Sequence, residues 1–227
     1  VGSEMCIRDR DIGCGWGGFA KYAAQTRGIR MHGLTISRSQ LEYAREFCTG
    51  LDCTFRFGDY RQLAEIYPQN FDAITIIGVT EHIGYKNLRR LHRIMRNRLK
   101  PGGLVLEHTI THMEPCRHTE PFIDRYIFPG GMVPSLEQLG DAMKKYFVLE
   151  DLHNFSADYD RTLMAWHANF RQAREAVEQA AHLGERFYRI WEYYLLCCAA
   201  MFRVRQAQLM QFVMSPEGVA GGYRRVS

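Results

Sequence analysis

The chain has 227 residues, of which 46% are hydrophobic and 24% are charged, and its formal net charge is +4 at pH 7. Such a composition belongs to a globular protein with one sizeable core and excludes a disordered or fibrous chain. The weak positive charge is compatible with anionic partners but does not indicate nucleic-acid binding, so we expect no nucleic-acid partner.

Seven cysteines are present, no CxxC pair occurs, and the chain is longer than the small secreted domains that disulfides stabilise. We therefore expect reduced, intracellular thiols, with neither a disulfide framework nor a metal site. The most apolar run, residues 193–202, is about half the length of a membrane-spanning helix. The sequence therefore predicts no transmembrane segment.

The segment VGSEMCIRDR, residues 1–10, does not suit the beginning of a buried sheet. A parallel strand covered on both faces is normally a run of Val, Ile and Leu. Here Arg8, Asp9 and Arg10 fill that position. We expect residues 1–10 to be a non-native or truncated start of the fold, with the first strand broken or partly missing.

Strand-like and helix-like segments alternate from residue 11 to about residue 155. The pattern predicts helices over 17–27, 37–49, 85–99 and 135–146. It predicts strands over 28–36, 52–58, 71–78, 103–111 and 147–155. This alternation indicates an α/β protein with a doubly wound parallel sheet.

The connections between these segments have their own signals. Ser37 is the expected N-cap of the second helix, and KPGG at 100–103 predicts a turn. Pro and Gly interrupt residues 120–135, which we expect to form an irregular connection. Residues 160–213 are expected to be mostly helical.

Ligands of doubly wound sheets bind beyond the carboxyl ends of the strands. Three predicted strand ends carry groups that are suited to ligand binding or catalysis. These groups are the turn from Asp11 to Gly18, then Glu81 with His82, and finally Glu107, His108 and Ile110. We expect them to lie close together at one edge of the sheet.

The stretch DIGCGWGG, residues 11–18, is a glycine-rich turn of the kind that binds nucleotides between a strand and a helix. A dinucleotide site needs an acidic residue about 20 residues further on, but that strand end carries Thr35 and Ser37. An acidic Asp11 directly before the glycines suits the cationic S-adenosylmethionine, and Asp59 is placed to accept a hydrogen bond from an adenine amino group. The pattern therefore favours S-adenosylmethionine.

Six blocks of the sequence share a resemblance to one enzyme family. The blocks are DIGCGWGGFAKYAA, GLTISRSQ, GVTEHIG, NRLKPGGLVLEHTI, IDRYIFPGGMVPS and HNFSADYDRTLMAW. Together they resemble the cyclopropane-fatty-acyl-phospholipid synthases, which include mycolic acid cyclopropane synthases and related fatty-acid C-methyltransferases. The first block is common among methyltransferases, whereas EHIG, EHTI, RYIFPGG and ADYDRTLMAW are much more specific.

The resemblance covers roughly residues 11–225. It implies a class I S-adenosylmethionine methyltransferase fold, Rossmann-like, with a C-terminal helical elaboration. Residues 11–111 would form the cofactor-binding core, and residues 112–227 would form the lipid site and the C-terminal helices.

The family's reaction adds a methylene group to a cis double bond of an unsaturated phospholipid acyl chain. The alkene attacks the methyl carbon of S-adenosylmethionine, and loss of a proton from the added methyl closes a cyclopropane ring. A bound bicarbonate ion is the base that the resemblance implies, because a strong nucleophile would trap the carbocation. No metal takes part.

The resemblance also implies which residues carry this reaction. The catalytic set is Cys14, Glu81, His108, Ile110 through its backbone, Tyr159 and Cys198. The cofactor-binding set is Asp11, Gly13, Gly15, Trp16, Gly17, Thr35, Ser37, Gln40, Asp59 and Tyr60. His82 is expected to be structural, and the basic run 86–100 is expected to be a solvated helix face, with a membrane-surface role as the alternative.

Two other functions stay open. One is C-methylation of a fatty acid or another small molecule on the same scaffold. The other is an inactive fragment that binds cofactor or lipid, since the N-terminal region of the family has no counterpart in this sequence. The expected partner is an unsaturated phospholipid in a bilayer, reached from the cytoplasm by peripheral contact, and a homodimer is left open.

Overall fold

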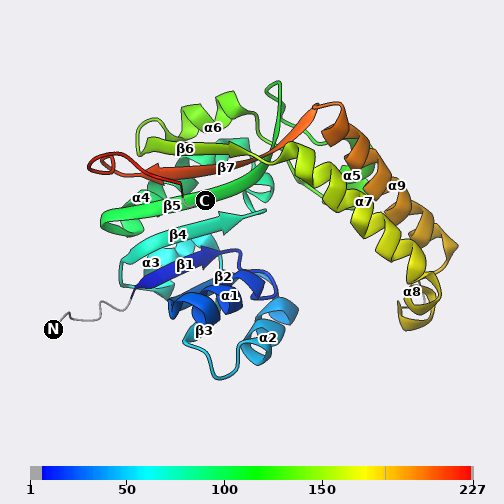
Figure 1. Ribbon diagram of the computed structural model, residues 1–227, viewed down its shortest axis with the longest axis horizontal. Helices are drawn as coiled ribbons and strands as arrows, with labels where there is room; N and C mark the ends of the chain where they lie inside the picture. The colour runs from blue at the N-terminus through cyan, green and yellow to red at the C-terminus, as the bar shows by residue number, and fades with distance from the viewer. Residues whose placement is uncertain (1–6, 182, 226–227) are drawn as a thin grey trace.

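The computed structural model describes residues 7–181 and 183–225, and within them a single sheet forms the centre of the molecule (Figure 1). Its seven strands lie in the order β3-β2-β1-β4-β5-β7-β6. The first five are parallel, whereas β7 is antiparallel to both of its neighbours. The strands are β1 (Arg8–Ile12), β2 (Arg30–Thr35), β3 (Cys53–Phe57), β4 (Phe71–Ile77), β5 (Leu99–His112), β6 (Val148–Asn154) and β7 (Ala207–Ser215).

Helices connect and cover these strands, which confirms the expected doubly wound α/β architecture. The α-helices are α1 (Gly18–Arg27), α2 (Arg38–Phe47), α3 (Leu63–Ile66), α4 (Leu88–Arg98), α5 (Pro121–Tyr126), α6 (Leu136–Met143), α7 (Ser156–Gln172), α8 (Arg174–Ala181) and α9 (Glu185–Arg203). The short 3₁₀ turns are η1 (Tyr60–Gln62), η2 (Thr80–His82) and η3 (Tyr85–Asn87).

The two long helices α7 and α9 lie side by side and extend away from the sheet (Figure 1). Leu163 of α7 and Leu195 of α9 belong to a small core of their own, which continues into β7 through Leu209. This core connects α7 and α9 to β7, in the C-terminal part of the sheet. The pair therefore forms one wall beside the carboxyl ends of the central strands.

Glycines shape the turn after β1. Gly13 has φ +73°, and a Cβ there would lie 2.2 Å from a methyl carbon of Val79. Gly17 has φ +84° and caps α1, and its Cβ would lie 3.0 Å from Cβ of Ala44 in α2. Only glycine satisfies both the left-handed backbone and these close approaches. The turn therefore leaves its backbone exposed at the carboxyl end of β1.

The prediction that the first strand is broken is wrong. Residues Arg8–Ile12 form β1, which pairs in parallel with β2 and β4, and residues 1–6 lie outside the described part of the chain. The side chains nevertheless suit this place poorly. Arg10 is fully buried, and no hydrogen-bond partner of its guanidinium exists among the described residues. Its charge lies 3.9 Å from the centre of the Tyr67 ring instead.

The largest error in the expected elements concerns the C-terminal region. Residues 160–213 were expected to be mostly helical, yet Ala207–Ser215 form β7, inserted between β5 and β6. A strand buried on both faces is a short apolar run, and such a run has no period that separates it from a buried helix. Its strand character comes from its neighbours in the sheet.

Two smaller differences lie in the connections. The predicted turn at 100–103 is part of β5, where the register jumps from the pair Phe71–Leu99 to the pair Ala73–Leu104. These residues bulge out of the ladder without ending the strand. The predicted irregular connection contains α5, whose first amides donate to the side chain of Glu120.

Candidate active site

A cavity of about 400 Å³ lies at the carboxyl ends of β1, β2 and β4. We call it the cofactor cavity, because six of the ten predicted cofactor residues line it. These six are Gly13, Gly15, Thr35, Gln40, Asp59 and Tyr60. The topology brings them together, since parallel strands deliver their carboxyl ends to one edge of the sheet.

The polar side chains of the cofactor cavity are held in place by their neighbours. Thr35 Oγ1 donates a 2.8 Å hydrogen bond to Gln40 Oε1, and Ser37 caps α2 by accepting from the Gln40 amide. Asp59 caps η1 and accepts two 2.8 Å hydrogen bonds from the Arg61 guanidinium, which lower the pKa of Asp59. The cavity therefore offers oriented oxygen atoms and a carboxylate that stays ionised.

The remaining predicted cofactor residues support the cavity from behind or beside it. Asp11 is buried beneath the glycine turn, where Thr75 Oγ1 donates to it at 3.1 Å and burial raises its pKa to about 6. Trp16 is exposed and packs edge-on against Tyr43. Gly17 and Ser37 act as the N-caps of α1 and α2.

A second cavity, of about 210 Å³, lies beside the first. We call it the inner cavity. Its walls come from the ends of β4 and β5, from the connection that contains α5, and from α7 and α9. Three predicted catalytic residues line it, namely Glu81, Ile110 and Tyr159. Segments from both halves of the chain therefore meet here.

Glu81 is the most constrained polar group of the inner cavity. Its Oε1 accepts a 2.7 Å hydrogen bond from the backbone N–H of Ile110. Its Oε2 is buried and has no hydrogen-bond partner among the described residues. Burial raises the pKa of this carboxyl, although the Ile110 amide opposes the shift. Glu81 can therefore hold a proton more readily than an exposed glutamate does.

Tyr159 faces the same cavity from α7. Burial raises the pKa of its hydroxyl, and the nearby Glu81 and Cys198 raise it further. The hydroxyl therefore stays protonated and can donate a hydrogen bond to an anion. Cys198 lies on α9. Burial raises the pKa of its side chain to about 12, so it remains a thiol, and it packs with the tyrosines of this core.

His108 lies on β5 two residues before Ile110, hence on the same face of that strand. Its ring is 5.8 Å from the ring of Phe155, and burial lowers its pKa, so the imidazole is neutral. It is not among the residues that line the inner cavity in the described structure. The structure therefore places His108 next to the cavity rather than in its wall.

The structure does not bring Cys14 to Glu81. The Cys14 side chain packs in a separate core cluster with Met31 and Phe55, and its backbone N–H donates to the Leu34 carbonyl at 2.9 Å. Burial raises the pKa of its thiol to about 12. The Cys14 side chain is thus not among the described lining of the inner cavity, and a catalytic role for Cys14 stays a prediction.

The cofactor and inner cavities adjoin at two residues that line both of them, Gly78 and His82. Gly78 follows β4 with φ +63°, and no described atom lies within 4 Å of the position of a Cβ there. His82 packs its ring against Phe128 at 5.5 Å. His82 was expected to be structural, and its position in the walls of both cavities adds it to the residues that can contact a ligand.

Another residue that the sequence did not single out is Tyr194, which lines the inner cavity. It lies one helical turn before Cys198 on α9, so both face the same way. Apolar side chains form much of the remaining wall: Ile123, Phe128, Met132 and Val133. The inner cavity is thus mostly apolar, and its polar side chains are those of Glu81, His82, Thr119, Tyr159 and Tyr194.

Comparison with known proteins identifies the family of this chain. The family model "Mycolic acid cyclopropane synthetase" matches residues 7–212. The cyclopropane-fatty-acyl-phospholipid synthase of Escherichia coli (strain K12) is 44% identical over 218 residues, which are 96% of this chain and 55% of that protein. The chain thus spans about half the length of the curated relatives it matches.

Two solved structures have the same fold. The cyclopropane synthase MmaA2 from Mycobacterium tuberculosis superimposes with a TM-score of 0.83 and 27% identity, covering 92% of this chain and 77% of that one. The mycolic acid cyclopropane synthase CmaA1, in complex with SAH and CTAB, gives a TM-score of 0.81 and 25% identity, with 92% and 77% covered.

Proposed function

The chain belongs to the mycolic acid cyclopropane synthetase family, and on that premise we propose that it transfers a methylene group from S-adenosylmethionine to a cis double bond of an unsaturated phospholipid acyl chain. Its fold is the class I Rossmann-like methyltransferase fold that the resemblance implied. The observation that carries the proposal is the junction of the cofactor and inner cavities at Gly78 and His82.

The residues of the cofactor cavity fit S-adenosylmethionine. Gly15 has φ +54° with no described atom within 4 Å of a Cβ position, so the turn leaves an open cradle. Thr35 and Gln40 offer oriented oxygen atoms to the ribose hydroxyls, and Asp59 offers a carboxylate to the adenine amino group. When bound, S-adenosylmethionine would supply an electrophilic methyl carbon on its sulfonium. Buried Asp11 supports the turn from below.

The residues of the inner cavity fit an acyl chain. An alkene is apolar and is bound most readily by a dry, apolar wall. Ile110, Phe128, Met132 and Tyr194 line the inner cavity and contribute to such a wall. Such a lining would keep water away from the reacting carbon, which would protect a carbocation from being trapped. This composition supports a lipid acceptor over a polar small molecule.

Glu81 and Tyr159 would hold the bicarbonate ion. Oε2 of Glu81 is buried and has no hydrogen-bond partner among the described residues, and because burial raises the pKa of this carboxyl, its protonated form would donate a hydrogen bond to the anion without giving up the proton. The protonated hydroxyl of Tyr159 is a second donor. Bicarbonate supplies a weakly nucleophilic base. His108 is neutral, lies just outside the wall and belongs to the same strand as Ile110.

The substrate places the enzyme at a membrane. Within the described residues no helix is long and apolar enough to cross a bilayer. Because the proposed acceptor lies in a bilayer, we propose peripheral contact from the cytoplasmic side, with an unsaturated phospholipid as partner, and a homodimer as the assembly to test. Flotation with unsaturated phospholipid vesicles and a sedimentation measurement check these two points.

The test of the function is methyl transfer itself. The chain is incubated with vesicles of unsaturated phospholipid and S-adenosylmethionine labelled in its methyl group, and the lipids are analysed by mass spectrometry and NMR. We expect a labelled CH₂ unit, loss of the double bond and cyclopropane proton signals. A labelled methyl branch would assign C-methylation instead, and the absence of label in every lipid would refute the proposal.

A further inference from the structure

The position of Glu81 depends on the short turn η2, which carries it. Backbone hydrogen bonds join this turn to its surroundings on either side. Before the turn, the Gly78 N–H donates to the His108 carbonyl of β5 at 2.9 Å. Within the turn, the Glu81 carbonyl accepts from the Met132 N–H at 2.7 Å. The side chain of Thr80 adds a third link, which runs into the core.

Thr80 is buried, and it lines neither the cofactor cavity nor the inner cavity in the described structure. Its Oγ1 donates a 2.7 Å hydrogen bond to Oε1 of Glu107. The next residue in the turn is Glu81, which lines the inner cavity. Thr80 therefore connects the turn to β5 from a place where it does not contact a ligand of either cavity.

Glu107 is a fixed acceptor for this hydrogen bond. It is fully buried on β5, and Nε2 of His92 lies 2.9 Å from its Oε2. The other ring nitrogen of His92, Nδ1, lies 2.9 Å from the Leu88 carbonyl one turn earlier in α4. Because a carbonyl oxygen only accepts, Nδ1 carries a proton, and the ring is held at both nitrogens. One oxygen of Glu107 is thus held by α4, and the other is bonded to η2.

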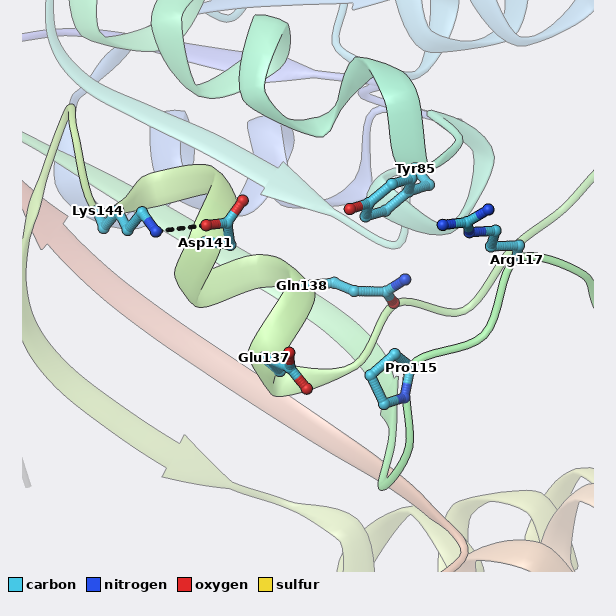
Figure 2. A pocket seen from close by; sticks show the side chains of 7 residues that line it. All are labelled: Tyr85, Pro115, Arg117, Glu137, Gln138, Asp141 and Lys144. Carbon is cyan, nitrogen blue, oxygen red and sulfur yellow. Dashed lines mark ion pairs between the residues drawn. The ribbon is translucent and has the colours of Figure 1, made fainter.

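Other ion pairs of α4 lie at the surface. Asp141 of α6 pairs with Arg89 of α4 at 2.6 Å and with Lys144 at 2.5 Å. Figure 2 shows Asp141 and Lys144 in the wall of a surface cavity of about 580 Å³. Water weakens such exposed pairs, so they contribute little. The buried pair of His92 and Glu107 costs desolvation that two apolar side chains would avoid, and a positioning role accounts for charged groups at this place.

Resting on the function proposed above, we propose that Thr80 is a positioning residue for methyl transfer, because its bond to Glu107 fixes the turn that carries Glu81. The Ile110 N–H, also on β5, holds Oε1 of Glu81 at 2.7 Å. The turn and the carboxyl are thus attached to the same strand at two points three residues apart. Both attachments together keep the free Oε2 of Glu81 in one position in the inner cavity, where a small displacement would slow the reaction.

The first test compares two variants of Thr80. Thr80→Val replaces the hydroxyl with a methyl group, whereas Thr80→Ser keeps the hydroxyl and loses a methyl group. We expect similar midpoints of urea denaturation, because one hydrogen bond and one buried methyl group contribute similar free energies. We expect Thr80→Val to lower the kcat of methyl transfer about tenfold or more, and Thr80→Ser to stay within about twofold of the unmodified chain. The KM for S-adenosylmethionine should be unchanged in both. Equal kcat values of the two variants would overturn the proposal.

Two control variants separate positioning from the loss of any buried hydroxyl or any ion pair of α4. Thr111 is another buried threonine of β5, and its Oγ1 donates to the Gln208 carbonyl. It lines neither of the two cavities as described. Thr111→Val and Asp141→Asn should both leave kcat near that of the unmodified chain. An effect of either control as large as that of Thr80→Val would contradict the positioning role.

A second measurement does not depend on turnover. The exchange of the Ile110 amide proton with solvent is followed by NMR on protein with isotope-labelled isoleucine, and Ile110→Val identifies the signal. We expect about fivefold faster exchange in Thr80→Val than in Thr80→Ser or the unmodified chain. Unchanged exchange in Thr80→Val refutes the positioning role whether or not methyl transfer occurs. Faster exchange in a chain that transfers no methyl group would support that role and refute only the proposed reaction.

Discussion

The backbone N–H of Ile110 donates a 2.7 Å hydrogen bond to Oε1 of Glu81, while Oε2 of the same carboxyl is buried without a partner among the described residues. This bond joins the end of β5 to the turn η2. It fixes one oxygen of the carboxyl and leaves the other for a ligand. Because burial also raises the pKa of Glu81, the group can act as a proton donor inside the cavity.

We expect Glu81→Gln to lower the rate of methyl transfer by a hundredfold or more, on the order of the effect of losing a positioned acid or base. The amide oxygen of Gln can still accept from the Ile110 N–H, so the fold and the binding of S-adenosylmethionine should be preserved. Label transfer and calorimetry of cofactor binding measure the two effects. Glu114→Gln, at an exposed carboxylate, is the control. A variant with unchanged rate would contradict the role of Glu81.

The junction between the two cavities makes a second prediction. Gly78→Ala places a methyl group in the space where the cofactor and inner cavities meet. We expect transfer to fall on the order of a hundredfold, because the reacting groups are displaced. The strained positive φ also costs about 1–3 kcal/mol of stability.

A control distinguishes obstruction from strain. Gly102 has φ +75° and, like Gly78, has no described atom within 4 Å of a Cβ position, but it lies in the bulge of β5 away from both cavities. Gly102→Ala should therefore lose comparable stability and keep its activity. Equal activities of the two variants, measured at a temperature where both are folded, would show that Gly78 does not form the passage.

A third prediction concerns the central strand. Arg10 is a buried cation whose guanidinium has no hydrogen-bond partner among the described residues and lies 3.9 Å from the centre of the Tyr67 ring, and burial lowers its pKa. An uncompensated buried charge destabilises the folded state. We expect Arg10→Leu to raise the free energy of unfolding by about 1–4 kcal/mol, measured by urea denaturation near neutral pH.

Arg56 provides the matched control for that variant. Its guanidinium lies 4.8 Å from the centre of the same Tyr67 ring, but the residue is exposed and donates to the Ile66 carbonyl at 2.6 Å. Arg56→Leu should give no gain in stability. A loss of stability in Arg10→Leu would mean that the contact with the ring outweighs the desolvation of the charge.

The fourth prediction rests on a buried ion pair behind the site. His92 Nε2 lies 2.9 Å from Glu107 Oε2, and Thr80 Oγ1 donates to Glu107 Oε1 at 2.7 Å. Burial opposes both charges, yet Glu107 raises the pKa of His92, and His92 and Thr80 lower the pKa of Glu107. The pair therefore stays ionised and anchors the turn η2.

The pH dependence follows from these directions. The raised pKa of His92 stabilises the fold below its ordinary value of 6.5, and this stabilisation is lost as pH rises through the raised value. The lowered pKa of Glu107 stabilises the fold at pH values above the ordinary glutamate pKa of 4.5. This stabilisation is lost as the pH falls through the lowered pKa. The contribution of the pair is thus largest between 4.5 and 6.5.

We expect Glu107→Gln to cost about 3 kcal/mol of unfolding free energy within that range and less at alkaline pH, as measured by urea denaturation. Thr80→Val removes one neutral donor and should cost about 1 kcal/mol. A cost of Glu107→Gln that does not change with pH would show that His92 is uncharged in the folded protein.

The sequence by itself determined the local structure and the family. The glycine turn, the cap at Ser37 and the apolar strand Phe71–Ile77 are decided by residues close in the chain, and the structure has them where the pattern predicts. The motif blocks pointed to the family that the comparisons confirm. Such features depend on backbone preferences and short-range hydrogen bonds, which residue type alone specifies.

Only the tertiary structure decided how the parts meet. It made a strand of Ala207–Ser215 and turned Cys14 away from the inner cavity. It also placed His82 and Tyr194 in the cavity walls, and it kept Arg10 in a strand that its charge disfavours. Each of these outcomes depends on contacts between residues far apart in the chain. Sheet pairing and the burial of side chains are set by those neighbours, so no local pattern contains them.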